Sequence, residues 1–142
     1  MSVFVDTSGL LAMLDRDDAA HERVKAVWQQ LLSGDTPLIT SNYVIVETVA
    51  LLQNRLEMEA VRLFQGDVVP ALDVKWIDEV VHHGATSALL AAARRRLSLV
   101  DCASFEIMRL HGCKSALTLD AHFREQGFMT QPASSLVKEG VV

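Results

Sequence analysis

The stretch VFVDTSGLLAML at residues 3–14 decides the fold of this chain. Its first three residues are apolar and end at Asp6, which is typical of a short buried strand with an acid at its carboxyl end. The next residues turn the chain into an apolar segment at 10–14, which we predict to be a helix with Ser8 as its N-cap. A buried strand that leads directly into a helix indicates an α/β fold.

Helical and strand patterns alternate along the rest of the chain. The predicted helices span residues 21–32, 42–53, 57–63, 78–96, 102–110 and 121–126. The predicted strands span residues 37–40, 72–77, 115–119 and 128–130. The helix at 42–53 is apolar on nearly every side, so we expect it to be buried. The alternation predicts a three-layer α/β/α architecture with a central, mostly parallel sheet.

The composition predicts one globular domain over residues 1–142, with a partly loose tail from about residue 132. No apolar window reaches the length of a membrane span, and the first residues lack a secretory signal, so we expect a soluble, cytoplasmic protein without a membrane partner. Cys102 and Cys113 lack zinc-type spacing and are expected to be buried. The net charge of −5 argues against nonspecific polyanion binding, although it does not exclude nucleic acid as a substrate at a metal-loaded site.

Four acidic residues stand in apolar surroundings: Asp6 in VFVDTS, Glu47 in YVIVETVALL, Asp101 in LSLVDCASF and Asp120 in SALTLDAHF. Burying ionised carboxylates costs several kcal/mol or more without a counter-charge, so a shared divalent cation is the simplest partner. Ligands of open α/β sheets bind beyond the carboxyl ends of the strands. Asp6 and Asp120 follow predicted strands and Asp101 opens a predicted helix, so they can converge there, whereas Glu47 must reach the site from within a helix.

Each acid also has a purely structural interpretation. Asp101 completes the capping-box pattern of Ser98 to Asp101, Asp120 can be an N-cap, Asp6 a turn residue, and Glu47 a salt-bridged core residue. Together these roles explain less, because capping requires neither an acid directly after VFV nor Glu47 inside an apolar helix. We therefore favour a joint site.

The predicted ligand set contains only oxygen, with no His or Cys at matching positions, which favours Mg²⁺ or Mn²⁺, as one or two ions. Such ions activate water and stabilise charge on phosphoryl oxygens. The sequence shows neither a Ser–His–Asp arrangement nor a glycine-rich phosphate loop. The basic run Arg94, Arg95 and Arg96 can hold RNA phosphates or simply be a solvated helix end. Among the histidines, His122 is the most interesting, because it follows Asp120 by two residues.

The segments VFVDTSGLLAMLD, NYVIVETVALL, RRRLSLVDCASFEIM and SALTLDAHFREQGF, in this order, resemble the PIN-domain family and within it the VapC-like toxins of type II toxin–antitoxin pairs. The resemblance covers nearly the whole chain. It implies a metal-dependent endoribonuclease with a Rossmann-like sheet, commonly a homodimer, that a VapB-like antitoxin inhibits by covering the active site.

By motif, the family's acidic positions correspond to Asp6, Glu47, Asp101 and Asp120, which the resemblance assigns to catalysis and metal binding. Ser8 and Thr118 match its small hydroxyl positions beside them. Some relatives carry a further aspartate near the fourth acid, where this chain has Thr118 and Ala121, and this leaves the second metal site open.

Two alternatives remain at this stage. A PIN-like binding module would use the acids for structure or for a protein partner, without catalysis. An aspartate-dependent phosphatase of the haloacid-dehalogenase type would also begin with a strand that ends in an aspartate. That family requires a second aspartate two positions later, where this chain has Ser8.

Overall fold

The structure is a computed structural model of the chain and describes residues 1–133, so most of the predicted loose tail lies outside the described residues. Five strands form one parallel sheet in the order β3-β2-β1-β4-β5. Their bounds are β1 Val3–Val5, β2 Leu38–Ser41, β3 Asp73–Lys75, β4 Ser115–Leu117 and β5 Met129–Gln131. The prediction of an α/β fold around a parallel sheet is confirmed.

Strand β1 lies at the centre of the sheet, with Phe4 aligned to Ile39 of β2 on one side and to Ala116 of β4 on the other. From β1 the chain builds outward through β2 and β3, and then returns to place β4 and β5 on the opposite side. The strand order therefore reverses between β1 and β4. In sheets of this kind, ligands bind beyond the carboxyl ends of the strands at this reversal.

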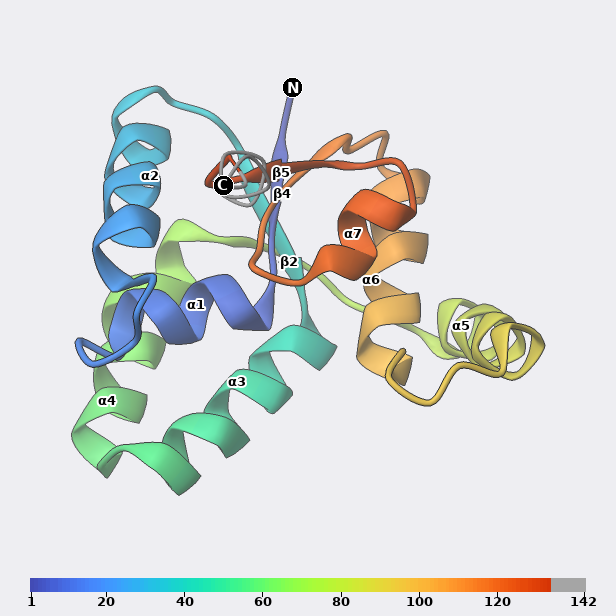
Figure 1. Cartoon of the computed structure of the whole chain (residues 1–142), viewed down its shortest axis with the longest axis horizontal. Helices are drawn as coiled ribbons and strands as arrows, with labels where there is room; N and C mark the ends of the chain where they lie inside the picture. The colour runs from blue at the N-terminus through green and yellow to red at the C-terminus, as the bar shows by residue number, and fades with distance from the viewer. Residues whose placement is uncertain (134–142) are drawn as a thin grey trace, which may run out of the picture.

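Helices cover both faces of the sheet, with α1, α2 and α4 on one side and α5, α6 and α7 on the other (Figure 1). Their bounds are α1 Thr7–Leu14, α2 His21–Ser33, α3 Asn42–Arg55, α4 Met58–Leu63, α5 Glu79–Ala92, α6 Leu99–Leu110 and α7 Ala121–Glu125. A π-helical turn, Phe64–Val68, and a 3-10 turn, Val69–Ala71, extend α4 and were not predicted. Of the helices in residues 1–133, none is long and apolar enough to cross a membrane.

Two predicted helix boundaries were wrong. Helix α1 begins at Thr7, so Asp6 and not Ser8 occupies the N-cap position, and the Asp6 side chain makes no capping hydrogen bond. Helix α5 ends at Ala92 instead of continuing to Arg96, because Ala93 adopts a left-handed conformation with φ of 51°. This turn lets Leu97 enter the core before Ser98 caps the next helix.

The prediction that α3 is buried was also wrong. Only Val44, Thr48 and Leu52 are buried, which is one stripe of the helix at a spacing of four residues. Val46 is 68% exposed. The helix is apolar around its circumference, but the core covers only one side of it.

Two packing features bring the ends of β1 and β4 together. Gly9 lies so close to β4 that an added Cβ atom would be 2.7 Å from the backbone oxygen of Leu117. Phe123 of α7 is fully buried, and its ring packs at 6.3 Å from Phe4 and 5.0 Å from Phe105, measured between ring centroids. Helices α1 and α7 are thereby held against the central strands, next to the loops that follow β1 and β4.

Candidate active site

A pocket of about 280 Å³ opens at the carboxyl ends of the central strands, and all four predicted acids line it. Asp6 follows β1, Glu47 projects from α3, Asp101 lies in the first turn of α6, and Asp120 is the N-cap residue of α7. The remaining lining residues are Thr7, Ser8, Leu11, Leu51, Arg96 and Ser98. The structure thus gathers acids from four separate elements at the reversal of the strand order.

Asp6 is the most deeply buried of these acids, with 4% of its surface exposed. Its Oδ2 atom accepts hydrogen bonds from the hydroxyls of Ser8, at 2.9 Å, and Thr118, at 2.8 Å. Burial, with a smaller contribution from the charge of Asp101, raises the pKa of Asp6 to about 6, although these two hydrogen bonds lower it. The ionised form of Asp6 is therefore destabilised in the folded protein, and a bound cation would stabilise it.

The same two hydroxyls connect Asp6 to the loop after β4. Ser8 Oγ accepts a hydrogen bond from the backbone N–H of Leu119 at 2.8 Å, and Thr118 Oγ1 accepts one from the N–H of Asp120 at 2.9 Å. Each hydroxyl donates to the carboxylate and accepts from the backbone, so its hydrogen-bonding capacity is well used. Ser8 and Thr118 therefore fix the position of Asp6 relative to Asp120.

Asp101 combines a capping role with a place in the pocket. Its Oδ2 atom accepts from the N–H of Ser98 at 3.1 Å, and its own N–H donates to Ser98 Oγ at 3.0 Å, which completes the predicted capping box. Burial raises the pKa of Asp101, and the nearby charge of Asp120 adds to that effect. The structural and functional interpretations of this residue are compatible.

Asp120 also caps its helix, because Oδ1 accepts from the N–H of His122 at 2.9 Å. This turn brings the His122 ring back over the acids: Nδ1 lies 3.1 Å from Asp120 Oδ1 and 3.5 Å from Asp101 Oδ2. Both distances suit an ion pair, but Nδ1 is buried and makes no hydrogen bond of acceptable geometry. The position of His122 two residues after Asp120 did not suffice to predict it as a site residue from the sequence.

Glu47 differs from the three aspartates. It is partly exposed, and it forms no ion pair with any residue in the range 1–133. The interpretation of Glu47 as a salt-bridged core residue was therefore wrong. One turn further along α3, Leu51 lines the same wall of the pocket.

The residues of the pocket fit a divalent cation. Asp101, Asp120 and His122 each offer a ligand atom, and these atoms lie within 4.8 Å of one another. Two of the buried polar atoms without a hydrogen bond, Thr7 Oγ1 and His122 Nδ1, lie at or beside the pocket. The sequence placed no histidine among these acids, whereas in the structure the N-cap turn of α7 brings the ring nitrogen of His122 beside Asp101 and Asp120.

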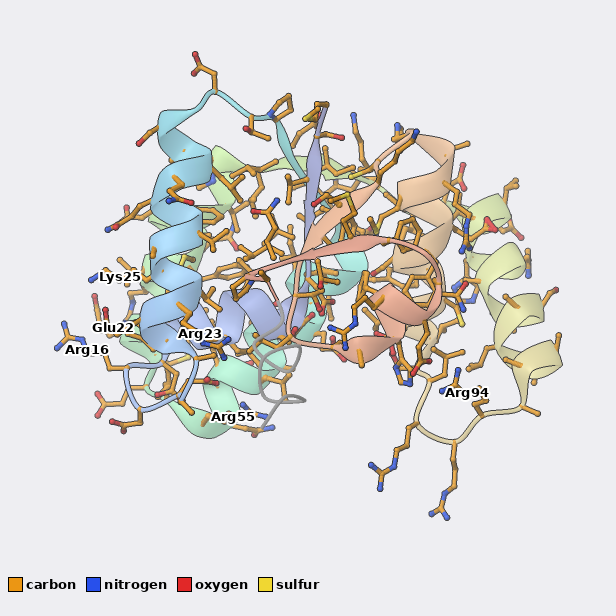
Figure 2. The ribbon with its side chains drawn as sticks, turned by 45° about the horizontal axis from the view of Figure 1, so that its top comes forward. Arg16, Glu22, Arg23, Lys25, Arg55 and Arg94 are labelled. Carbon is orange, nitrogen blue, oxygen red and sulfur yellow. The ribbon has the colours of Figure 1, made fainter. Side chains whose placement is uncertain are left out.

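The predicted arginine run divides in the structure. Arg96 lines the pocket, whereas Arg94 forms an ion pair with Glu125 at 3.1 Å, and Arg95 is exposed. On the side of the molecule opposite Arg94, Figure 2 labels four further basic residues, with the acidic Glu22 among them. They come from the loop after α1, from α2 and from the end of α3, and are Arg16, Arg23, Lys25 and Arg55.

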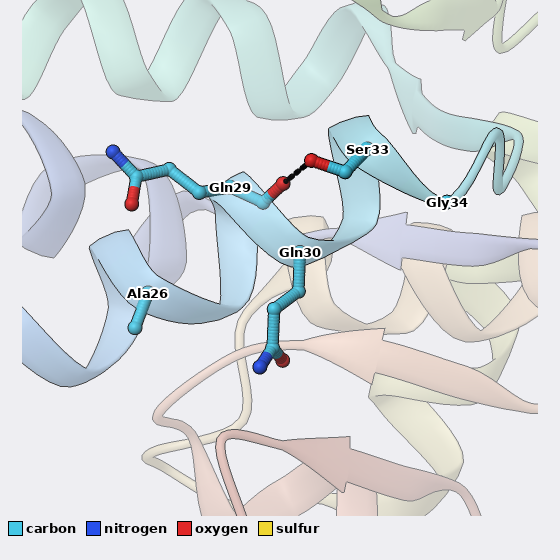
Figure 3. Close-up of a pocket in the computed structure, with 5 residues that line it drawn as sticks. All are labelled: Ala26, Gln29, Gln30, Ser33 and Gly34. Atoms are coloured by element: carbon cyan, nitrogen blue, oxygen red, sulfur yellow. Dashed lines mark hydrogen bonds between the residues drawn. The ribbon is translucent and has the colours of Figure 1, made fainter.

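A larger hollow, of about 530 Å³, lies on the outer face of α2 (Figure 3). Ser33 Oγ in this hollow donates to the backbone oxygen of Gln29 at 2.9 Å. The lining residues are all exposed and carry no charged side chain: Ala26, Gln29, Gln30, Ser33 and Gly34. This surface lacks the groups that catalysis or metal binding would require, so the acidic pocket is the candidate site.

The fold and the pocket define a class: small α/β domains whose carboxylates converge at the reversal of strand order in a parallel sheet. Within this class the chain belongs to the PIN domain family, whose pattern matches residues 3–129. It is 31% identical over 128 residues to the 23S rRNA-specific endonuclease VapC20 of Mycobacterium tuberculosis, in two strains, and the match covers 89% of this chain and 95% of VapC20.

Solved structures show the same fold. The crystal structure of Mycobacterium tuberculosis VapC20, described as a toxin that cleaves the sarcin–ricin loop, matches with a TM-score of 0.79 and 30% identity over 90% of this chain and 97% of that chain. FitAcB from Neisseria gonorrhoeae matches with a TM-score of 0.66 and 15% identity over 90% of this chain and 95% of that chain. FitAB bound to an IR36 DNA fragment matches with a TM-score of 0.65 and 18% identity over 90% and 92%. At these lower identities, the last two matches support the fold alone.

Proposed function

We propose that this chain is a metal-dependent endoribonuclease that hydrolyses RNA phosphodiester bonds and serves as the toxin of a toxin–antitoxin pair. The observation that carries the proposal is the convergence of Asp6, Glu47, Asp101 and Asp120 on one pocket at the reversal of strand order. The kinship with VapC20, an endonuclease, over most of both chains supports it. A phosphatase of the haloacid-dehalogenase type finds no support in this kinship or in the position of Ser8, which holds Asp6 by a hydrogen bond.

The residues of the pocket would have different roles in this reaction. Asp6, Asp101 and Asp120 would hold one or two Mg²⁺ or Mn²⁺ ions, and Ser8 and Thr118 keep Asp6 in place. When bound, a divalent cation would supply water activation and stabilisation of negative charge on the phosphoryl oxygens during hydrolysis of the phosphodiester bond.

Two further residues that line the pocket, Glu47 and Arg96, could act on the substrate. Glu47 has no ion-pair partner among the described residues, so its carboxylate is free to bind cation or to accept a proton from water. Arg96, on the pocket wall, would attract the RNA phosphate by charge. Arg94 and Arg95 could add weaker phosphate contacts from the same loop.

The first RNA to test is 23S rRNA, and within it the sarcin–ricin loop, because VapC20 is named for cleaving it. Intact ribosomes and purified total RNA should be treated in parallel, and the cleavage sites mapped. One dominant cleavage site in 23S rRNA would support the proposal that this chain and VapC20 share a substrate as well as a fold. Cleavage at many sites in other RNA would still support an endoribonuclease, but it would show that 23S rRNA is not its specific substrate.

The decisive test of the proposal is cleavage by purified protein with Mg²⁺ or Mn²⁺, with and without chelator. We expect the chelator to stop cleavage and Asp101→Asn to abolish it. Asp17→Asn, in an exposed acid outside the pocket, is the matched control and should cut normally. Undiminished cutting by Asp101→Asn would contradict the proposal, and calorimetry without any cation binding would favour the alternative of a binding module.

We also propose a VapB-like antitoxin and a second copy of the chain as protein partners, in the cytoplasm, for this single PIN domain. Exposed apolar side chains on the two consecutive helices α3 and α4 support a protein partner: Val46 on α3, at 68%, and Met58 and Leu63 on α4, each at 47%. Co-expression with the product of a neighbouring short reading frame should yield a complex without ribonuclease activity. Light scattering of the free chain tests the homodimer.

A further inference from the structure

His122 is the only nitrogen donor among the described side chains that lies in contact with the acids of the pocket. Its side chain is 15% exposed, and the buried Nδ1 atom is left without a hydrogen bond. Leaving a buried polar atom unpaired costs about 1–3 kcal/mol, so an unpaired nitrogen that faces two carboxylates needs an explanation.

The local fold fixes the direction of this ring. The N–H of His122 donates to Asp120 Oδ1, which closes the first turn of α7. The next residue, Phe123, is fully buried against Phe4 and Phe105 and anchors that turn in the core. The ring of His122 is therefore held over the pocket by the backbone and not by a contact of its own.

The distances around Nδ1 match the coordination shell of a metal ion. Ligands about 2.1 Å from an octahedral ion lie about 3 Å apart along each edge of the octahedron. Nδ1 lies 3.1 Å from Asp120 Oδ1 and 3.5 Å from Asp101 Oδ2. One ion between the three groups would satisfy the nitrogen and neutralise both carboxylates.

A simple ion pair explains these contacts less well. An imidazolium that served only as a counter-charge would direct its N–H along one of the two lines to the carboxylates, and neither contact has the geometry of a hydrogen bond. A metal ion requires the ring lone pair to point into the space between the oxygens, not at either of them.

We propose that His122 Nδ1 is a direct ligand of the divalent cation, and that this mixed nitrogen–oxygen set makes the site selective for Mn²⁺ over Mg²⁺. Mg²⁺ prefers oxygen ligands and near-ideal geometry, whereas imidazole nitrogen suits transition-metal ions. The inference rests on the proposed function, because it concerns the same site, but it adds a ligand and a preference among cations.

The test uses the full chain, stripped of metal with chelator and titrated separately with Mn²⁺ and Mg²⁺ by calorimetry. Wild-type protein should bind Mn²⁺ more tightly than Mg²⁺, and His122→Phe, which keeps a ring without nitrogen, should lower the ratio of the two affinities about tenfold or more. His83→Phe, at an exposed histidine on α5 away from the pocket, is the matched control and should leave the ratio unchanged.

A spectroscopic measurement on the wild-type protein gives a second readout. Electron spin-echo modulation of bound Mn²⁺ should show coupling to one imidazole ¹⁴N nucleus, which should disappear in His122→Phe and persist in His83→Phe. If His122→Phe does not fold, His122→Asn replaces it, and the wild-type spectrum alone still decides the ligand.

The outcomes separate the inference from the proposed function. Tight Mn²⁺ binding without ¹⁴N coupling, or an unchanged affinity ratio in folded His122→Phe, would overturn the role of His122 and leave the metal-dependent nuclease intact. Failure of the wild-type protein to bind either cation would instead overturn the metal dependence itself.

Discussion

The two walls of the acidic pocket hold their carboxylates in opposite ways. On the sheet side, Asp6 is buried and accepts hydrogen bonds from Ser8 and Thr118. On the helix side, Glu47 is partly exposed on α3 and has no ion-pair partner among residues 1–133. The first carboxylate is preorganised at a cost in stability, whereas the second is free to adjust.

This difference shows how a small fold can combine a rigidly held carboxylate with an adjustable one at the same site. Asp6 follows a central strand, where backbone and side-chain positions are determined by the sheet and by the close contact at Gly9. Glu47 is carried by a helix of which the core covers one stripe. We therefore expect Asp6 to govern both catalysis and stability, and Glu47 to govern catalysis alone.

Among the variants that compare the two walls, the largest effect is expected for Asp6→Asn. Loss of this carboxylate should reduce RNA cleavage about a thousandfold or more, because metal-ion catalysis contributes several kcal/mol. The metal-free variant should nevertheless be more stable than the wild type, since the buried charge is gone. Cleavage rates and urea unfolding, with Asp17→Asn as control, measure the two effects. A variant less stable than the wild type above pH 6 would contradict the view of Asp6 as strained.

The pH dependence of stability tests the same strain without a mutation. The pKa of Asp6 is raised from 3.8 to about 6, so the folded state binds more protons than the unfolded state between these values. The metal-free protein should therefore lose about 3 kcal/mol of stability from this group as the pH rises from 3.8 to 6.

The raised pKa of Asp101 acts in the same direction. Urea unfolding across this pH range should show a weaker decline in Asp6→Asn than in the wild type. Adding Mn²⁺ above pH 6 should restore stability, because the cation binds the ionised form of the folded protein. If the free energy of unfolding of the wild type rose throughout the range from pH 3.8 to 6, the ionised form of Asp6 would not be destabilised by folding.

Glu47→Gln should separate catalysis from stability. We expect cleavage to fall about 10- to 100-fold, while the free energy of unfolding changes by about 0.5 kcal/mol or less, because the side chain has no fixed partner to lose. Glu106→Gln, in an exposed acid of α6 outside the pocket, is the control. If Glu47→Gln stabilised the metal-free protein as much as Asp6→Asn, the contrast between the two walls would be lost.

Ser8→Ala should weaken the sheet-side wall. It removes a hydrogen bond to Asp6 and leaves the N–H of Leu119 without its acceptor, so we expect a loss of about 1–2 kcal/mol in the free energy of unfolding near neutral pH. Thr118→Ser, which keeps a hydroxyl at the other partner of Asp6, should lose less. Equal losses in the two variants would show that packing, and not the hydrogen bonds, positions Asp6.

The smallest effect is expected for Arg96→Ala. Removing one cationic side chain from the pocket wall should raise KM for RNA a few-fold, leave kcat nearly unchanged and reduce the salt dependence of binding. Arg95→Ala removes an exposed neighbour that does not line the pocket and serves as control. A larger effect at Arg95 than at Arg96 would move the RNA path away from the pocket.

Much of this arrangement was predictable from local pattern. Apolar runs and helical spacing identified the strands and helices, and the acids in apolar surroundings identified the pocket residues, because a buried charge stands out in a sequence. The capping box at Ser98 and Asp101 was also visible, since its spacing is set by one turn of helix.

Errors arose where the outcome depended on residues distant in sequence. The hydroxyl of Ser8 could serve as an N-cap by local rules, but it bonds to Asp6 and to Leu119, 111 positions away. Helix α3 looks buried from its composition, yet the core is only large enough to cover one stripe of it. His122 could not be assigned to the site, because its position depends on how Phe123 packs between β1 and α6.

By itself, the sequence determined the α/β fold, its family resemblance and the four acids, because each depends on short-range periodicity or on a charge in apolar surroundings. Only the tertiary structure decided that these acids share one pocket, that hydroxyls from two strand ends hold Asp6, and that a ring nitrogen joins the carboxylates. These features depend on the order of strands in the sheet and on the packing of α1 and α7 against it, and long-range contacts of this kind leave no local signal in the chain.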